Sequence, residues 1–154
     1  MKKTSIRQLF HFMMLCHIFA LICGLVGSVF ILVNYNMFVN SLGKIIGTVF
    51  SIASIVGFVV LVVFSSNAII TLLKDFESLK TNEYISIIGK VLRFEKNRDP
   101  DSGMQINDKP VVLILDTKEE ITLIINDKII VGETYQFNYL SNSRIAEVVK
   151  KASE

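Results

Sequence analysis

FMMLCHIFALICGLVGSVFILV, residues 12–33, is an uninterrupted apolar run of about 22 residues. About 20 such residues suffice to cross a bilayer as a helix. A second apolar run follows, and its residues 45–64 are long enough for another crossing. Between Leu9 and Leu73 the only charged side chain is that of Lys44. The sequence therefore predicts a hairpin of two transmembrane helices, with spans at about 12–33 and 45–64.

A cleaved signal peptide is the alternative for the first run. Its basic start fits, but the apolar stretch exceeds the usual 7–15 residues, and no A-x-A-like cleavage site follows. Cys23 is preceded by the bulky Ile22, which does not fit a lipoprotein signal. We therefore expect the first helix to be retained.

The composition changes sharply at Lys74, after which the chain is dense in charge. This step places a transmembrane hairpin at 1–73 and a β domain at 83–154. Between them, residues 65–82 read as an amphipathic stalk, because apolar residues recur there at three- and four-residue steps. They are Ile69, Leu72, Leu73, Phe76 and Leu79.

Basic residues flank the hairpin unevenly. Lys2, Lys3 and Arg7 precede the first span, and Lys74 and Lys80 follow the second. The loop between the spans carries a single lysine. By the positive-inside rule, both termini should be cytoplasmic. We expect a multi-pass protein of the inner, or cytoplasmic, membrane, with the lipid bilayer as its first partner.

Both spans contain small residues at four-residue spacing, which lets helix backbones approach closely in lipid. They are Cys16, Ala20, Gly24 and Ser28 in the first segment, Gly43, Gly47 and Ser51 in the second, and a further pair in the second, Ala53 and Gly57. Such faces either close the hairpin itself or pack against other copies of the chain. Two helices alone cannot enclose a pore, so membrane permeabilisation requires a homo-oligomer.

The C-terminal half has the pattern of a small all-β domain. In one segment Tyr135, Phe137 and Tyr139 alternate with polar residues, as in a strand with one buried face. The expected strands are Tyr84–Glu95 with a bulge or bend at Gly89, Val111–Asp116, Ile121–Asn126, Thr134–Leu140 and Arg144–Val149. Five short strands predict an OB-like or partly open five-stranded barrel, and adjacent apolar residues suggest that its sheet is covered on both sides.

Several function classes are disfavoured. The C-terminal half contains neither Cys nor His, so thiol nucleophiles, histidine bases and zinc ligands are missing there. Glu119 and Glu120 are expected at an exposed hairpin tip, where adjacent carboxylates diverge. From Lys74 onward, 12 basic residues face 14 acidic ones, a net charge of −2, which disfavours long nucleic acid as a partner. We expect no enzyme, catalytic residue, metal site or cofactor.

One basic cluster stands out in this otherwise acidic half. Its members are Lys90, Arg93, Phe94, Lys96 and Arg98. Lys and Arg side chains pair with phosphate, and an aromatic ring can stack on a base. The cluster is thus the predicted ligand-binding site, repeated around the axis of an oligomer. An ordinary charged strand end facing water is the alternative.

The layout of two spans followed by a cytosolic β module resembles the small membrane effectors of bacterial antiviral defence, in CRISPR and CBASS systems. This resemblance, together with the basic cluster, implies a cyclic oligonucleotide ligand and helices that act on the membrane. The segment Ile130–Tyr135, which leads into a β-strand, is similar to short NfeD-type membrane proteins, which place an OB-like domain after their helices.

Two functions from different classes follow. The first is an oligomeric membrane effector whose cytosolic β domain binds an anionic nucleotide second messenger and whose helices then perturb or permeabilise the membrane. The second is a membrane-tethered protein-interaction module, such as a scaffold, regulator or immunity protein, without a small ligand. A membrane-anchored nucleic-acid binder is disfavoured by the acidic balance of the β half.

Overall fold

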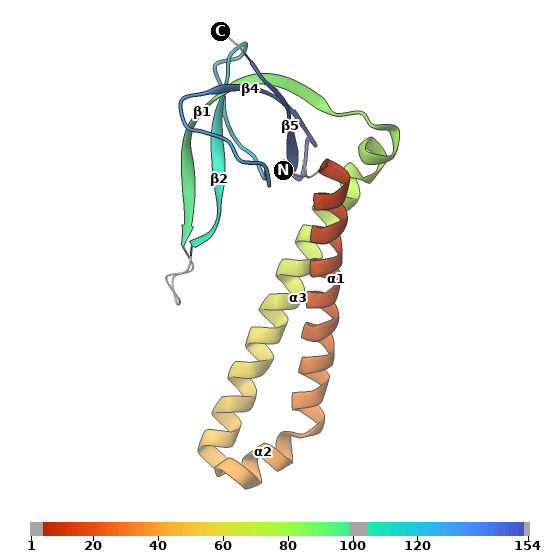
Figure 1. Cartoon of the computed structure of the whole chain (residues 1–154). Helices are drawn as coiled ribbons and strands as arrows, with labels where there is room; N and C mark the ends of the chain where they lie inside the picture. Colours follow the sequence, from red (N-terminus) through yellow and green to blue (C-terminus); the bar gives the residue numbers. More distant parts are fainter. Residues whose placement is uncertain (1–4, 99–104, 153–154) are drawn as a thin grey trace. The chain divides into compact units, whose positions relative to one another are not determined.

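The computed structural model describes residues 5–98 and 105–152, with only the backbone for 96–98 and 105–108. The described helices and strands follow one another in the order that Figure 1 labels. The helices are α1 (Ile6–Val33), α2 (Tyr35–Leu42) and α3 (Lys44–Thr81), and the strands are β1 (Ile85–Arg98), β2 (Gln105–Ile114), β3 (Glu120–Thr122), β4 (Thr134–Tyr139) and β5 (Ala146–Lys151).

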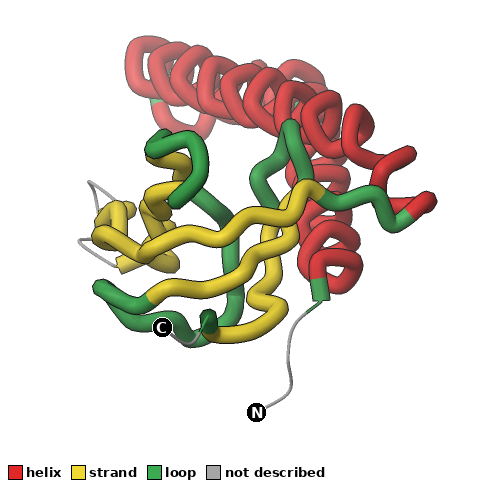
Figure 2. Tube along the Cα trace, turned by 90° about the horizontal axis from the view of Figure 1, so that it is seen from above, coloured by secondary structure: helices red, strands yellow, loops and turns green. Residues whose placement is uncertain are grey.

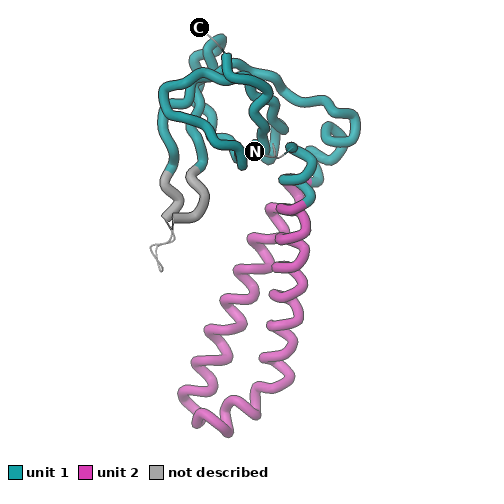
Figure 3. The backbone as a smooth tube through the Cα atoms, viewed as in Figure 1, with its two compact units in different colours: residues 1–11, 73–154 teal, residues 12–72 magenta. Residues whose placement is uncertain are grey.

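The chain forms two compact units (Figure 3). The helical unit consists of residues 12–72. The sheet unit combines the described residues up to His11 with those from Leu73 onward. The first turns of α1 and the last turns of α3 therefore belong to the same unit as the sheet.

Both long helices are long and apolar enough to cross a membrane. Only 11% of the most apolar window of each helix is buried, whereas the core helix of a soluble protein is mostly buried. The chain between them was expected to be a loop. It is instead the helix α2, with the Tyr35 hydroxyl 3.0 Å from Oγ1 of Thr48.

Glycines allow close packing inside the helical unit. A Cβ atom on Gly24 would lie 2.7 Å from Cγ2 of Val62, and one on Gly27 would lie 2.5 Å from the Phe58 ring. The small residues of α1 thus close the hairpin at Gly24. Gly47 approaches the backbone of α2, whereas a Cβ atom on Gly57 would meet no atom within 4 Å.

The five described strands form one antiparallel sheet in the order β3-β2-β1-β4-β5. Its two outer strands continue into segments that meet, because Ile124 and Ile145 form a parallel bridge. Backbone hydrogen bonds join Ile124 N to Arg144 O and Ala146 N to Ile124 O, each at 2.9 Å. The curved strands are visible in Figure 2.

Strand bounds differ from expectation around the first hairpin. β1 extends to Arg98 and β2 begins at Gln105, whereas the first expected strand ended at Glu95 and the second began at Val111. Asn97 pairs with Ile106 and Arg98 with Gln105, so these residues extend the hairpin as a polar ribbon. The pairing was not predicted, because the polar composition of this stretch is that of a loop.

The predicted irregularity of β1 was also misplaced. Gly89 pairs regularly with Ile114 and Tyr135, and the register shifts instead between Val91 and Arg93 and between Glu95 and Asn97. Gly89 serves close packing, since a Cβ there would overlap Cγ1 of Val112. A single glycine in a strand indicates either a bulge or a close approach by a neighbouring residue, and the sequence alone does not distinguish the two.

The core of the sheet unit confirms the alternation predicted for the fourth strand, with Tyr135, Phe137 and Tyr139 buried. The core cluster consists of Val91, Val112, Leu123, Tyr135, Phe137, Tyr139 and Ala146. Val111 and Val112 are adjacent and both buried, so β2 is covered on both faces at this point.

Candidate functional site

The predicted basic cluster lies along β1, and the structure describes three of its five side chains. Those of Lys90 and Arg93 are exposed, and that of Phe94 is half-buried. The side chains of Lys96 and Arg98 lie outside the described residues, although both backbones belong to β1. The register shift after Val91 adds a residue between Lys90 and Arg93, which changes the alternation expected for a regular strand.

Arg93 has a partner within the sheet. Its Nη2 lies 2.9 Å from Oε2 of Glu120, and both side chains are about half exposed. Glu120, expected at the hairpin tip without a role, is in fact the first residue of β3. Glu95 likewise accepts a hydrogen bond of 3.2 Å from the hydroxyl of Thr122. A phosphate bound at Arg93 would share the guanidinium with the Glu120 carboxylate, whose negative charge opposes its binding.

A second group of cations lies on the outer face, which we define as the face of the sheet opposite the core cluster. Ile88, Gln136 and Lys150 form one row across β1, β4 and β5. They line a pocket of about 210 Å³ together with Lys151 and Ala152. We call it the outer-face pocket. Lys90 lies two residues from Ile88 on the same face, because alternate strand residues point to the same side.

The cations of this pocket differ in their partners. Lys151 forms an ion pair with Glu133, which also accepts a 2.6 Å hydrogen bond from the Tyr135 hydroxyl. Hydrogen bonds from Lys151 and Tyr135 hold the pKa of Glu133 below its usual value, and the contact with Glu133 raises the pKa of Lys151. Burial, followed by the bond to Glu133, raises the pKa of Tyr135. Lys150 forms no ion pair within the described residues and is the cation available to a ligand.

Asp75 connects the end of α3 to the turn between β4 and β5. Its side chain is fully buried. Oδ1 accepts hydrogen bonds from Asn142 Nδ2 at 2.7 Å, Asn142 N at 3.1 Å and Ser141 Oγ at 3.4 Å, and Oδ2 accepts one from Ser143 N at 2.6 Å. We call this arrangement the Asp75 latch.

The latch stabilises a charged carboxylate in a buried place, beyond the apolar span of α3 expected at residues 45–64. Burial alone would raise the pKa of Asp75, but hydrogen bonds from Ser143 and Asn142 outweigh it and hold the pKa below its ordinary value of 3.8. Asp75 is therefore ionised at neutral pH, and the turn is bound to α3 by charge-assisted hydrogen bonds.

The first turn of α1 is attached to the sheet as well. Oε2 of Glu147, in β5, accepts a hydrogen bond of 3.2 Å from the backbone amide of Ile6. A carboxylate at this position accepts a hydrogen bond from an otherwise unpaired amide and interacts favourably with the positive end of the helix dipole. Ile6 and Phe10 are each 1% exposed. Both long helices thus have one end built into the sheet unit.

Sequence reasoning missed the latch, the Glu147 contact and Lys150. Asp75 and Glu147 make their bonds across 66 to 141 residues of chain, which no local pattern reveals. Lys150 follows two β-branched residues, Val148 and Val149. Because β-branched residues favour strands, this pair could have predicted that the strand continues to Lys150. Among the described residues, no group of three or more His, Cys, Asp or Glu is arranged to hold a metal ion.

Comparison with known proteins gives no family for this chain. No protein-family model matches it, and no curated protein or solved structure matches either.

Proposed function

We propose that this protein is a membrane-anchored effector in which the β domain binds an anionic, phosphate-bearing ligand and transmits the binding event to two membrane helices. The observation that carries the proposal is the Asp75 latch. It joins the turn between β4 and β5 to α3, while Glu147 joins β5 to the start of α1. A displacement of β5 would therefore be transmitted to one end of each long helix.

The β domain is best understood as an OB-type barrel. Its five antiparallel strands and the bridge between Ile124 and Ile145 support this assignment, because the bridge brings the two sheet edges together. OB barrels bind oligonucleotides, which agrees with a nucleotide ligand. The role in antiviral defence rests on the resemblance of layout to CRISPR and CBASS effectors.

The ligand would be held by cations of β1 and the outer face. Lys90 and Lys150 are exposed and have no ion pair within the described residues, and Gln136 adds an amide between their strands. Of the cluster first predicted, Arg93 already has one guanidinium nitrogen, Nη2, at Glu120 and would bind an anion through the others. Lys96 and Arg98 remain part of the proposed site.

The helices act in the membrane as a homo-oligomer with both termini in the cytoplasm. The charge distribution supports this orientation. Ala53 and Gly57 support the oligomer, since both are exposed and Gly57 has no neighbour within 4 Å of where a Cβ would lie. Small residues left open on a membrane helix suit contact with another copy.

A membrane-tethered protein-interaction module is the second candidate. It is favoured by two adjacent apolar side chains between β3 and β4, of which Ile130 is 60% exposed and Val131 is 48% exposed. Exposed apolar residues that are contiguous mark interaction surfaces more often than isolated ones do.

Calorimetry of the full chain in lipid nanodiscs, against linear and cyclic oligonucleotides, separates the two candidates. Lys150→Gln and Lys90→Gln should each weaken binding by about 1–3 kcal/mol, the scale of charge-assisted hydrogen bonds. Lys128→Gln, an exposed loop lysine outside the pocket, is the control. A cyclic ligand on an oligomer axis should bind once per oligomer. If no oligonucleotide binds the wild type, the interaction module takes first place.

A further inference from the structure

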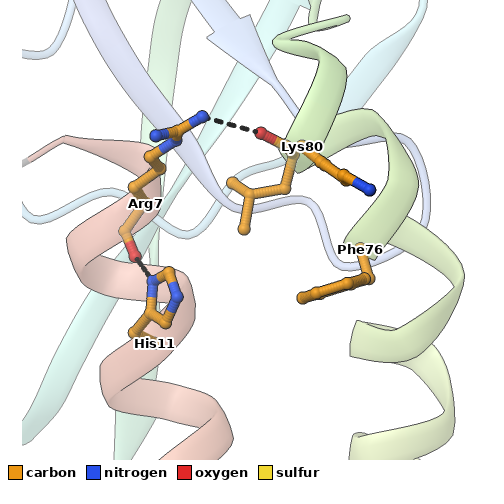
Figure 4. A pocket seen from close by; sticks show the side chains of 5 residues that line it. Arg7, His11, Phe76 and Lys80 are labelled. Carbon is orange, nitrogen blue, oxygen red and sulfur yellow. Dashed lines mark hydrogen bonds between the residues drawn. The ribbon is translucent and has the colours of Figure 1, made fainter.

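A second pocket lies within the sheet unit, between the first turns of α1 and the last turns of α3 (Figure 4). Its volume is about 210 Å³. We call it the helix-end pocket. Its lining residues are Arg7 and His11 from α1 and Phe76, Leu79 and Lys80 from α3.

The polar part of the helix-end pocket is cationic. Arg7 and Lys80 are basic, and none of the five lining residues is acidic. Nη2 of Arg7 donates long hydrogen bonds to Leu79 O at 3.4 Å and to Asn82 Oδ1 at 3.3 Å. These contacts hold the guanidinium at the pocket and involve only one of its three nitrogens. The other nitrogens can donate to an anion.

His11 adds a directed nitrogen. Its Nδ1 lies 2.7 Å from the carbonyl oxygen of Arg7 (Figure 4). A carbonyl only accepts, so the hydrogen is on Nδ1 and this nitrogen is the donor. Nε2 is left as an acceptor for another partner.

The remaining wall is apolar and comes from Phe76 and Leu79. Phe76 is 51% exposed although it is a large aromatic side chain. A free phosphate or nucleotide phosphate gains nothing from such a wall. A molecule that joins a phosphate to a hydrocarbon chain matches both halves of the pocket.

On the α1 side, the helix-end pocket lies near the expected membrane boundary. The first expected span begins at Phe12, and Arg7 is five residues before it. At 1.5 Å per residue this is about 7.5 Å along the helix, at the outer edge of a headgroup layer about 5–7 Å thick. The α3 residues of the pocket belong to the amphipathic segment 65–82, which continues beyond the second expected span.

We propose that the helix-end pocket binds the phosphate of an anionic phospholipid from the cytoplasmic leaflet. Arg7 and Lys80 contact the phosphate, and the start of an acyl chain packs on Phe76 and Leu79. Basic pockets between membrane helices on the cytoplasmic side bind anionic headgroups in this way. The proposal rests on the membrane anchoring of the proposed function, and not on its nucleotide ligand.

Native mass spectrometry of the full chain in neutral detergent tests the site, with phosphatidylglycerol and phosphatidylcholine as probes. The wild type should retain one phosphatidylglycerol per chain at least about tenfold more tightly than phosphatidylcholine. Arg7→Gln and Lys80→Gln should each reduce this preference about tenfold. Lys74→Gln, a cation of the same helix that does not line the pocket, should leave it unchanged.

Two controls keep the outcomes distinct. Arg7→Gln also removes the contacts with Leu79 and Asn82, so its thermal unfolding is measured in parallel, whereas Lys80 has no ion pair within the described residues. Inorganic phosphate and glycerol phosphate are added as competitors. Displacement of the lipid by either would assign the pocket to a soluble phosphate and overturn the proposal.

Equal binding of the two lipids, or equal loss in Lys74→Gln and Lys80→Gln, would also overturn it. A chain that remains in solution without detergent would refute the membrane anchoring itself. The failure of every oligonucleotide to bind would remove the messenger from the proposed function and leave this result unchanged.

Discussion

Replacing Asp75 by alanine removes the acceptor of the Asp75 latch and leaves the turn donors without their partner. The two shortest contacts, 2.6 Å from Ser143 N and 2.7 Å from Asn142 Nδ2, account for most of the effect. A hydrogen bond to a charged group contributes about 1.5–3 kcal/mol, which bounds their sum at about 3–6 kcal/mol. Removing the carboxylate also removes its desolvation cost, so we expect the free energy of opening the latch to fall by about 3 kcal/mol.

Hydrogen exchange of the full chain in detergent is the appropriate assay, because it reports local opening. If the turn opens locally, a loss of about 3 kcal/mol accelerates exchange of the Asn142 and Ser143 amides by about 150-fold. Asp75→Asn keeps one carbonyl oxygen but places an amide group near a donor, and we expect about half of the loss. Lys74→Ala, the exposed neighbour, should change exchange by less than about threefold. Unchanged exchange in Asp75→Ala would refute the reasoning.

The same assay has a defined pH dependence. The pKa of Asp75 in the folded protein lies below its ordinary value of 3.8. A carboxyl group of this kind contributes stability that is fully present above the unfolded pKa and is lost as the pH falls through the folded pKa. Protection of the Asn142 and Ser143 amides should therefore be constant near neutral pH and decline only below about pH 4. In Asp75→Ala this acid-dependent decline should be absent.

Two further predictions concern the separate units. Phe137→Ala should destabilise the sheet unit by about 3–5 kcal/mol, because Phe137 is fully buried in the core. Val149→Ala, at a half-exposed position of β5, should cost much less. Chemical denaturation followed by circular dichroism measures both. Gly24→Leu should separate α1 from α3, since even a Cβ there would lie 2.7 Å from Val62, whereas Gly57→Leu should not; the distance between spin labels on the two helices distinguishes them.

The sequence predicted those parts of the fold that depend on local periodicity. The long apolar helices follow from uninterrupted runs, and β4 follows from the alternation of Tyr135, Phe137 and Tyr139. β4 is half-buried, so its pattern has period two. The extension of β1 to Arg98 was missed, because a polar ribbon has the composition of a loop.

The candidate site was less accessible to prediction, because its side chains meet only after folding. The register shift in β1 precedes Arg93, which contacts Glu120, and nothing in the sequence places these two charges together. Asp75 is fully buried, although it is not one of the apolar positions that predicted the buried side of residues 65–82. A single acidic residue gives the same sequence signal whether it faces water or a turn with free amides.

Leakage of a trapped dye from liposomes that contain the full chain is the most direct test of the central claim. The account predicts that an oligonucleotide which binds the wild type also triggers leakage. It predicts that Asp75→Asn binds the same ligand with unchanged affinity but releases less dye, because the coupling between the β domain and α3 is weakened. Binding without leakage in the wild type, or equal leakage in Asp75→Asn, would contradict it.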